Sequence, residues 1–237
     1  MFRAIGFDIG DTLLFYADTP LDWSSHYNDA LAAVARACAV SPTAPQVATA
    51  CQILRHYNTR IRPRTEEIAA DDIFSEILSA WSLAAADHLQ VAVGSFFVFF
   101  QQRMCAFPET RSVLRTLRAA GMRLGALTDI PYGMPMQFVQ RDLDGAQVSG
   151  FLHSVLTSAM VGVRKPDPAG YHALAASLGV TPDQMLYVGN EPKDVIGARR
   201  AGVPSAFVVR TGTTCDHGQT FSITSLAALP ELVSAAV

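Results

Sequence analysis

The chain has 237 residues, half of them apolar and 16% charged, so it can bury a substantial core as one large domain or as a core with a smaller inserted domain. Its formal net charge of −3 gives no reason to expect a nucleic-acid-binding protein. The four cysteines, which include Cys215, are widely spaced and form no CxxC pair, which argues against a zinc site or a disulfide framework.

Neither a leader nor a membrane span is expected from the sequence. The N-terminus begins directly on strand-like sequence, with no basic segment followed by a cleavable apolar stretch. The most apolar run, residues 91–100, is about half the length of a membrane span and is better interpreted as a buried helix. We therefore expect a cytoplasmic protein, monomeric or homodimeric, with neither a membrane nor a nucleic acid as partner.

The first predicted element is a short buried strand that delivers a carboxylate to its C-terminal end. An apolar run that starts at Phe2 stops abruptly at Asp8, and Gly10, Asp11 and Thr12 follow it. In open parallel α/β sheets, ligands bind beyond the carboxyl ends of the strands. A carboxylate at such a place suits covalent catalysis by Asp. An Asp that only caps a following helix is the alternative interpretation.

After the first strand, the strand pattern stops for about ninety residues. The spacing of apolar residues predicts helices over 23–40, 46–57 and 71–83, and one or two more over 84–104. A basic stretch over residues 55–64, which starts in the last turn of the second helix, contains Arg55, His56, Arg60, Arg62 and Arg64. Clustered arginines could clamp a carboxylate or a second phosphate of a substrate, with Arg60 as our candidate, or they could form a solvated face.

Strands and helices alternate from residue 107 onward. Strands are predicted over 123–127, 153–157, 185–188 and 206–209. Helices are predicted over 110–120, 136–143, 168–178 and 194–201, with a final helix over 225–237. Strand–helix repetition with short links predicts an α/β fold with a parallel, doubly wound sheet and right-handed crossovers.

Three later segments carry polar groups that complement Asp8. The apolar run 124–127 ends in Thr128 and Asp129, a proline-bracketed loop contains Lys165, and the run 185–188 leads into an acidic loop that contains Asn190, Glu191 and Asp194. An Asp, a Thr, a Lys and an acidic loop in this order resemble the haloacid dehalogenase-like (HAD) hydrolase superfamily. The resemblance covers about residues 1–14 and 107–212.

The resemblance implies a division of the chain into two domains. A Rossmann-like HAD core would comprise residues 1–15 and 106–237, and an inserted all-helical cap of the C1 type would comprise residues 16–105. In that family the helical cap closes over the active site and selects the substrate.

The resemblance also implies a role for each matching residue. Asp8 would be the nucleophile, Thr128 would hydrogen-bond a transferring phosphoryl oxygen, and Lys165 would offset the repulsion between two anions. Asp129 joins Thr128 and Lys165 as a substrate-binding candidate, although the family usually has Asn at that position. A strand-end hydroxyl that caps the next turn is the alternative for Thr128, and a solvated surface lysine is the alternative for Lys165.

A Mg²⁺ site is expected by the same resemblance. Its ligands would be Asp8, the backbone carbonyl of Gly10, Asn190 and Asp194, because Mg²⁺ prefers oxygen ligands. Asn190 departs from the usual Asp and supplies one negative charge fewer. Glu191 could restore that charge directly or through a water molecule.

The second departure lies two residues after the nucleophile. HAD phosphatases normally carry there an Asp that protonates the leaving group and activates water, whereas this chain has Gly10, with Asp11 one place later. Gly10 could let the loop rearrange so that Asp11 reaches the leaving group. Acid–base help could instead be absent or come from the cap, or phosphatase activity could be vestigial. Asp11 could also be a simple turn cap.

These observations favour a Mg²⁺-dependent phosphohydrolase that acts on a small phosphorylated metabolite through an aspartyl-phosphate on Asp8. Two alternatives stay open. A 2-haloacid dehalogenase would use Asp8 to attack carbon, and that branch also lacks the second Asp. A binding or regulatory protein on a hydrolase scaffold would explain both altered positions, Gly10 and Asn190.

Overall fold

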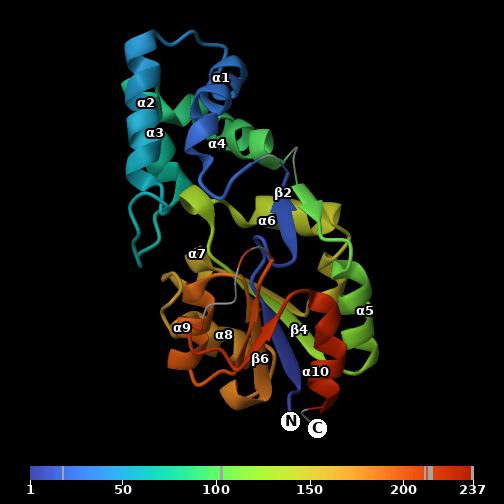
Figure 1. Ribbon diagram of the computed structural model, residues 1–237. Helices are drawn as coiled ribbons and strands as arrows, with labels where there is room; N and C mark the ends of the chain where they lie inside the picture. Colours follow the sequence, from blue (N-terminus) through green and yellow to red (C-terminus); the bar gives the residue numbers. More distant parts are fainter. Residues whose placement is uncertain (18, 102–103, 211, 213–215, 236–237) are drawn as a thin grey trace. The chain divides into compact units, whose positions relative to one another are not determined.

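The computed structural model describes residues 1–17, 19–101, 104–210, 212 and 216–235, so Cys215 and the last two residues of the predicted final helix lie outside the described residues (Figure 1). The backbone contacts divide the chain into two compact units. One comprises Met1–Phe15, Cys105–Asp129 and Leu143–Val237. The other comprises Tyr16–Met104 and Ile130–Asp142.

The first unit contains a six-stranded sheet in the order β5-β4-β1-β6-β7-β8. Its neighbouring strands pair in parallel, which confirms the predicted doubly wound α/β fold. The strands are β1 (Ala4–Phe7), β4 (Arg123–Thr128), β5 (Ser154–Thr157), β6 (Met185–Gly189), β7 (Ser205–Val208) and β8 (Phe221–Ile223).

Strand β1 lies at the centre of this sheet and at the point where the strand order reverses. The chain proceeds to β4 and β5 on one side of β1, and to β6, β7 and β8 on the other. All four residues of β1 are buried, as expected for a parallel strand that is covered on both faces. Ligands of such sheets bind at the carboxyl ends of the strands beside this reversal, which is where β1 ends.

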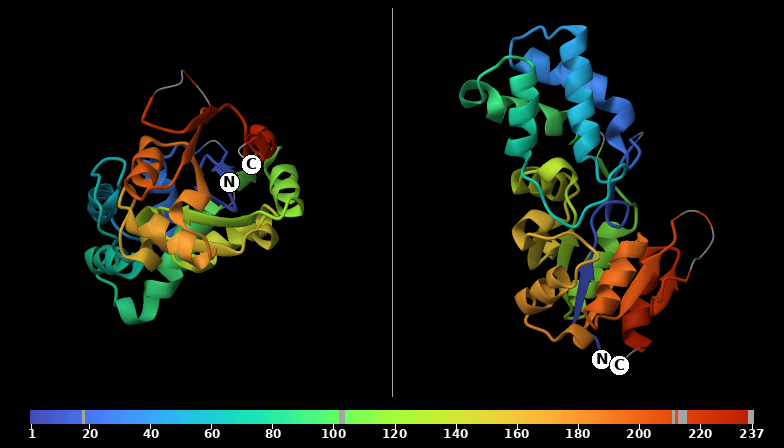
Figure 2. Two further views of the ribbon diagram at one scale, coloured as in Figure 1. Left: turned by 90° about the horizontal axis from the view of Figure 1, so that it is seen from below. Right: turned by 90° about the vertical axis from the view of Figure 1, so that its left-hand side faces the viewer.

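Helices cover both faces of the sheet (Figures 1 and 2). Helices α8 (Ala169–Ser177) and α9 (Pro192–Arg200) lie on one face, and α5 (Thr110–Ala119) and α10 (Leu229–Ala235) lie on the other. A short helix, α7 (Ser158–Val161), follows β5. Leu174 of α8 packs closely against the sheet at two glycines, Gly6 and Gly125. A Cβ atom at these positions would lie only 2.6 Å and 2.9 Å from the Leu174 side chain, so a larger residue would push α8 away.

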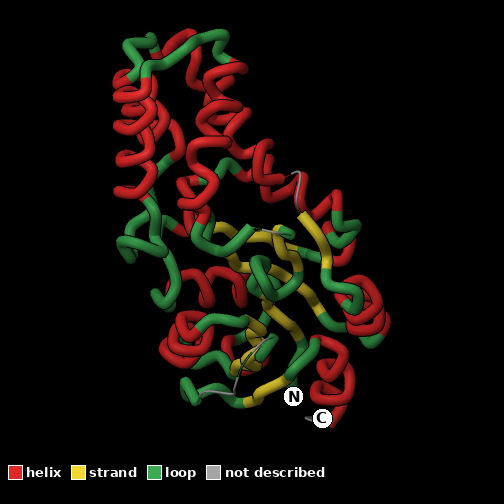
Figure 3. Tube along the Cα trace, turned by 45° about the horizontal axis from the view of Figure 1, so that its top comes forward, coloured by secondary structure: helices red, strands yellow, loops and turns green. Residues whose placement is uncertain are grey.

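The second unit is mainly helical. It contains α1 (Tyr27–Ala37), α2 (Ala44–Tyr57), α3 (Ala70–Ala80), α4 (Ala85–Gln101) and most of α6 (Met136–Gly145). Figure 3 shows this predominance of helix in tube form. Its core is rich in aromatic rings, because Trp23, Phe96 and Phe100 pack together with Tyr132.

Two short strands that the sequence did not predict, β2 (Leu14–Tyr16) and β3 (Met104–Ala106), form a separate two-stranded sheet where the chain passes between the units. The helical unit also includes residues 130–142, which lie outside the predicted cap range of 16–105. The division into a catalytic core and a substrate-selecting cap stays a proposal.

Within the described residues, no single helix is both long enough and apolar enough to cross a membrane. The pair α3 and α4, bent by 115°, meets that test by length and composition alone.

Candidate active site

Three neighbouring strands bring the predicted site residues to one edge of the sheet. Phe7 of β1 lies opposite Ala126 of β4 and Val188 of β6, so the residues that follow these strands emerge side by side. The backbone N–H of Asp8 donates to the carbonyl of Val188 at 2.8 Å, which extends the pairing to the predicted nucleophile.

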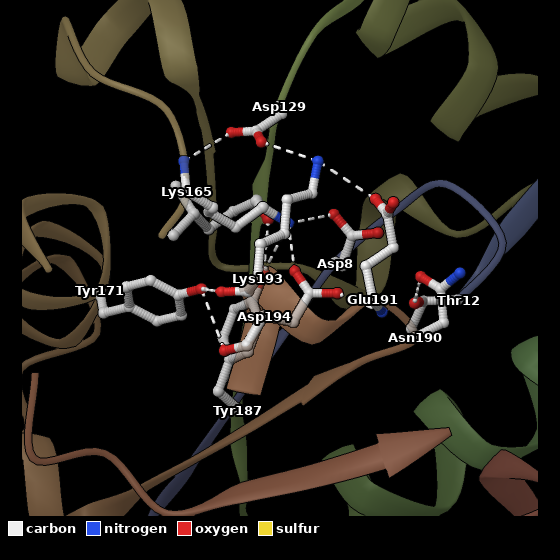
Figure 4. Close-up of polar contacts among 11 residues, drawn as sticks. Asp8, Thr12, Asp129, Lys165, Tyr171, Tyr187, Asn190, Glu191, Lys193 and Asp194 are labelled. Atoms are coloured by element: carbon white, nitrogen blue, oxygen red, sulfur yellow. Dashed lines mark hydrogen bonds and ion pairs between the residues drawn. The ribbon is translucent and has the colours of Figure 1, made fainter. Parts of the chain in front are cut away.

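Lys165 connects Asp8 to the acidic loop (Figure 4). Its Nζ lies 2.6 Å from Asp8 Oδ1 and 2.6 Å from Asp194 Oδ1, and it donates to the Tyr187 hydroxyl at 3.3 Å. The Lys165, Asp8 and Asp194 side chains are only 2%, 7% and 1% exposed. An ammonium group has three N–H donors, and these three acceptors match that number. The alternative of a solvated surface lysine is therefore wrong.

The buried charges shift one another's pKa values. Burial raises the pKa of the Asp8 carboxyl to about 7, while Lys165 opposes the increase and Asp194 adds to it. Burial disfavours the ammonium of Lys165, but the carboxylates of Asp194 and Asp8 outweigh burial and hold the pKa of Lys165 well above its ordinary value. Lys165 is therefore a fixed positive charge beside a carboxylate that titrates near neutral pH.

A second lysine forms ion pairs closer to solvent. Lys193, in the first turn of α9, lies 2.9 Å from Asp129 Oδ2 and 3.1 Å from Glu191 Oε2, and its side chain is 25% exposed. Asp129 also accepts a hydrogen bond from the backbone N–H of Lys165 at 3.0 Å. Although burial opposes it, the charges of Lys165, Lys193 and Arg164 hold the pKa of Asp129 below its ordinary value. Asp129 thus links the end of β4 to two loops of the site.

The loop after Asp8 turns tightly. The carbonyl of Ile9 accepts hydrogen bonds from the N–H groups of Thr12, Leu13 and Leu14, and the N–H of Asp11 donates to Leu14. Asp11 has a φ of 55°, in the left-handed region that residues other than Gly rarely adopt. A Cβ on Gly10 would meet no atom within 4 Å, so a side chain at that position would have open space.

The other end of this loop is held by two side-chain contacts. The Thr12 hydroxyl donates to Asn190 Oδ1 at 3.0 Å, which connects the loop to the predicted metal ligand. Arg210 donates to the Thr12 carbonyl at 2.7 Å and to Glu109 at 2.5 Å, and its guanidinium lies 3.6 Å from the Phe107 ring centroid.

Two other predicted site residues, Thr128 and Arg60, lie in different units of the protein. Thr128 is the last residue of β4, is buried, and makes no side-chain hydrogen bond to the described part of the protein. Its hydroxyl therefore has capacity for a ligand. Arg60 belongs to the helical unit, where it is exposed and its backbone N–H donates to Asn58. The substrate-binding roles of Thr128, Asp129 and Arg60 stay predictions.

Sequence reasoning missed two residues of this cluster, Tyr187 and Lys193. Tyr187 was absorbed into the apolar run of β6, although a tyrosine inside a buried strand signals a hydroxyl that needs a partner. Lys193 lies in the acidic loop, and no local sequence pattern shows its pairing with Asp129, because the two residues are distant in sequence.

Comparisons with known proteins find similarity in sequence and in fold. The family model for haloacid dehalogenase-like hydrolase matches residues 2–202. A phosphoglycolate phosphatase from Rhodospirillum rubrum is 41% identical over 98 residues, which are 41% of this chain and 39% of that protein. The matches to this and two further curated relatives cover between 39% and 55% of the relative's length.

Two solved structures share the fold along almost the whole chain. A 2-haloacid dehalogenase from Pseudomonas syringae has a TM-score of 0.71, 22% identity and coverage of 100% of both chains. A HAD phosphatase from Thermococcus onnurineus has a TM-score of 0.68, 20% identity and coverage of 98% of this chain and 97% of its own. At these identities the similarity shows the fold alone.

Proposed function

The chain belongs to the haloacid dehalogenase-like hydrolase family, and from that premise we propose that it is a Mg²⁺-dependent phosphohydrolase that acts on a small phosphorylated metabolite through an aspartyl-phosphate on Asp8. The observation that carries the proposal is the buried bridge from Lys165 to Asp8 and Asp194 at the carboxyl end of β1. The curated relatives that match part of the chain, among them a phosphoglycolate and a phosphoserine phosphatase, support phosphorus chemistry.

The reaction would use the second carboxylate oxygen of Asp8. Oδ1 accepts from Lys165, whereas Oδ2 has no hydrogen-bond partner in the described part of the protein. Oδ2 would attack phosphorus as the bond from phosphorus to the leaving oxygen breaks, and that oxygen takes up a proton from solvent water. Water would then attack the same phosphorus and lose a proton to solvent, which releases phosphate and restores the Asp8 carboxylate. Lys165 would remain beside Asp8 and reduce the repulsion between the two anions.

The residues around Asp8 fit a Mg²⁺ ion. Asp8, the Gly10 carbonyl and the Asn190 amide offer the hard oxygen ligands that Mg²⁺ prefers. When all are charged, the carboxylates of Asp8, Asp129, Glu191 and Asp194 exceed the basic groups of Lys165, Lys193 and Arg164 by one. A phosphate dianion would meet this excess unless a cation neutralised it. When bound there, Mg²⁺ would supply that neutralisation and orient the phosphoryl oxygens.

Both carboxylate oxygens of Asp194, a predicted metal ligand, already have partners within the protein. Its Oδ1 lies 2.6 Å from Lys165 Nζ, and its Oδ2 accepts from the Glu191 N–H at 2.9 Å. Within the described residues, no group of three or more His, Cys, Asp or Glu side chains is arranged to hold a metal ion. The donor set proposed here has two carboxylates, of which Asp194 also serves as the charge partner of Lys165.

Phosphate release from a panel of phosphomonoesters tests the proposed function. We expect hydrolysis with Mg²⁺, no hydrolysis after EDTA treatment, and recovery when Mg²⁺ is added back. Halide release from 2-haloacids that survives EDTA would favour the dehalogenase alternative. No turnover of either class would favour a binding or regulatory protein.

The charge missing at Asn190 predicts a measurable change in metal affinity. Asn190→Asp should lower the Mg²⁺ concentration for half-maximal activity by about tenfold, because it adds one negative charge to an oxygen site. The Thr12 hydroxyl can still donate to the new carboxylate. Gln184→Glu, which adds the same charge at the opposite end of β6, should leave that concentration unchanged. An equal shift in both variants would contradict a ligand role for Asn190.

Restoring the family's second carboxylate should increase turnover. A side chain at Gly10 meets open space, so Gly10→Asp can be accommodated and should raise kcat for alkyl phosphates by about 10- to 100-fold through general acid–base catalysis. The increase should be smaller for p-nitrophenyl phosphate, whose leaving group needs no protonation. Gly10→Asn, of the same size, should give no increase. A similar gain in both variants, or no dependence on the leaving group, would contradict this explanation.

A further inference from the structure

Tyr187 contacts the ammonium group of Lys165. It occupies the middle of β6, is fully buried, and stacks edge-on against Tyr171 with ring centroids 4.7 Å apart. Its hydroxyl lies 2.7 Å from the carbonyl of Leu127 on β4 and 3.3 Å from Lys165 Nζ (Figure 4). One phenol oxygen therefore contacts both the strand that carries Thr128 and the lysine of the active site.

The direction of these two hydrogen bonds is fixed by chemistry. A backbone carbonyl can only accept, so the Tyr187 hydroxyl donates its proton to Leu127 and presents its lone pairs to Lys165. Burial raises the pKa of Tyr187 well above its ordinary value, so the phenol keeps its proton at working pH. Tyr187 is thus a neutral acceptor for one of the three N–H groups of Lys165.

The neutral contact differs from the other two in one respect. Asp8 and Asp194 hold Lys165 through charge, and the charge at Asp8 moves from its carboxylate oxygens to the attached phosphoryl group when Asp8 is phosphorylated during turnover. The contact with Tyr187 does not change at that step. It therefore limits the movement of the ammonium group while the charge at Asp8 is redistributed.

We propose that Tyr187 is a positioning residue, whose hydroxyl fixes the third N–H of Lys165 so that the ammonium group stays beside Asp8 throughout turnover. The proposal rests on the proposed phosphohydrolase function. Tyr187 would thus affect catalysis through Lys165, without contacting the substrate.

Tyr171 provides a matched control for the test. It is also fully buried, belongs to the same ring pair, and directs its hydroxyl to the backbone carbonyls of Asp194, at 3.1 Å, and Lys193, at 3.3 Å. Tyr187→Phe and Tyr171→Phe therefore each remove one buried hydroxyl from a backbone carbonyl, but only the first removes an acceptor from Lys165.

Steady-state kinetics should separate the two variants. We expect Tyr187→Phe to lower kcat by about tenfold with KM changed less than twofold, since one hydrogen bond to a charged group is lost. Tyr171→Phe should lower the melting temperature similarly but change kcat less than twofold. Equal losses of kcat in both variants, or an unchanged kcat in Tyr187→Phe, would overturn the proposal.

A second measurement does not depend on activity. The ¹⁵N-labelled Lys165 ammonium, assigned with Lys165→Met, should give a slowly exchanging NMR signal in the unmodified protein and in Tyr171→Phe, and a faster-exchanging one in Tyr187→Phe. This readout separates failure of the proposal from failure of the proposed function. Absence of a slowly exchanging signal in the unmodified protein, or its persistence in Tyr187→Phe, would overturn the role of Tyr187.

A further variant covers the case in which Tyr187→Phe does not fold. p-Aminophenylalanine in place of Tyr187 keeps an N–H donor for Leu127 but offers Lys165 only a weak acceptor. It should retain the melting temperature and still show the tenfold loss of kcat with faster ammonium exchange. Full kcat with an unchanged ammonium signal in this variant would overturn the proposal.

Discussion

Asp8→Asn is expected to reduce kcat by about 10⁴-fold or more, because it removes the nucleophile on which the covalent intermediate forms. The amide keeps the shape of the side chain and can still accept a hydrogen bond from Lys165. The loss should therefore appear in kcat without unfolding, as measured by phosphate release and by thermal denaturation of the same preparation.

The stability of the same variant tests the charge state of Asp8. Its pKa is raised from 3.8 to about 7 in the folded protein, so the folded state binds a proton more tightly than the unfolded state. The stabilisation from this group is complete below about pH 4 and is lost as the pH rises through about 7. Since Asn does not titrate, the stability of Asp8→Asn relative to the unmodified protein should increase from pH 5 to pH 9. Residual activity near the unmodified rate, or a relative stability that falls over this range, would contradict the account of Asp8.

Lys165→Met is expected to impair both activity and stability. Removal of one partner from a buried ion cluster leaves Asp8 and Asp194 without their shared cation, which costs about 3–5 kcal/mol. For a chain of this size the melting temperature should fall by roughly 6–20 °C. Activity should fall by about 10³-fold, because the repulsion between Asp8 and phosphate is no longer offset. Thermal denaturation in EDTA and phosphate release with Mg²⁺ measure the two effects.

The pH dependence and a control variant make this prediction specific. Without Lys165 the pKa of Asp8 should rise further, so protonation relieves the repulsion at pH 6 but not at pH 9, and the loss of stability should be larger at pH 9. Lys193→Met removes a lysine that is 25% exposed, so its ion pairs are screened more by solvent than those of Lys165, and the loss of stability should be smaller. Similar losses of stability in the two lysine variants would contradict the buried bridge.

The sequence predicted most of the fold because the sheet strands that hold the site are short apolar runs with polar ends. β1, β4 and β6 were all anticipated, and so was the approach of Lys165 to Asp8. The strands β2, β3 and β8 have three residues each, too few to show a periodicity. The helix expected over 23–40 begins instead as a 3₁₀ turn at Trp23, capped by Asp22, before α1 starts at Tyr27.

Side-chain partners were harder to predict because they depend on packing between distant segments. Asp194 was expected as a metal ligand, and its contact with Lys165 joins residues 29 positions apart. The left-handed backbone of Asp11 could not be anticipated either, because the residue type does not favour it as Gly does. The acid–base role of Asp11 stays a prediction.

Detection of a phosphoryl group on Asp8 tests the central claim most directly. The enzyme, quenched during turnover of p-nitrophenyl phosphate with Mg²⁺, would be reduced with borohydride, which converts an acyl phosphate to an alcohol, and digested for mass spectrometry. The account predicts reduction at residue 8 in the unmodified protein and none in Asp8→Asn or in samples with EDTA. Reduction at another residue, or turnover with no reducible group at residue 8, would contradict it.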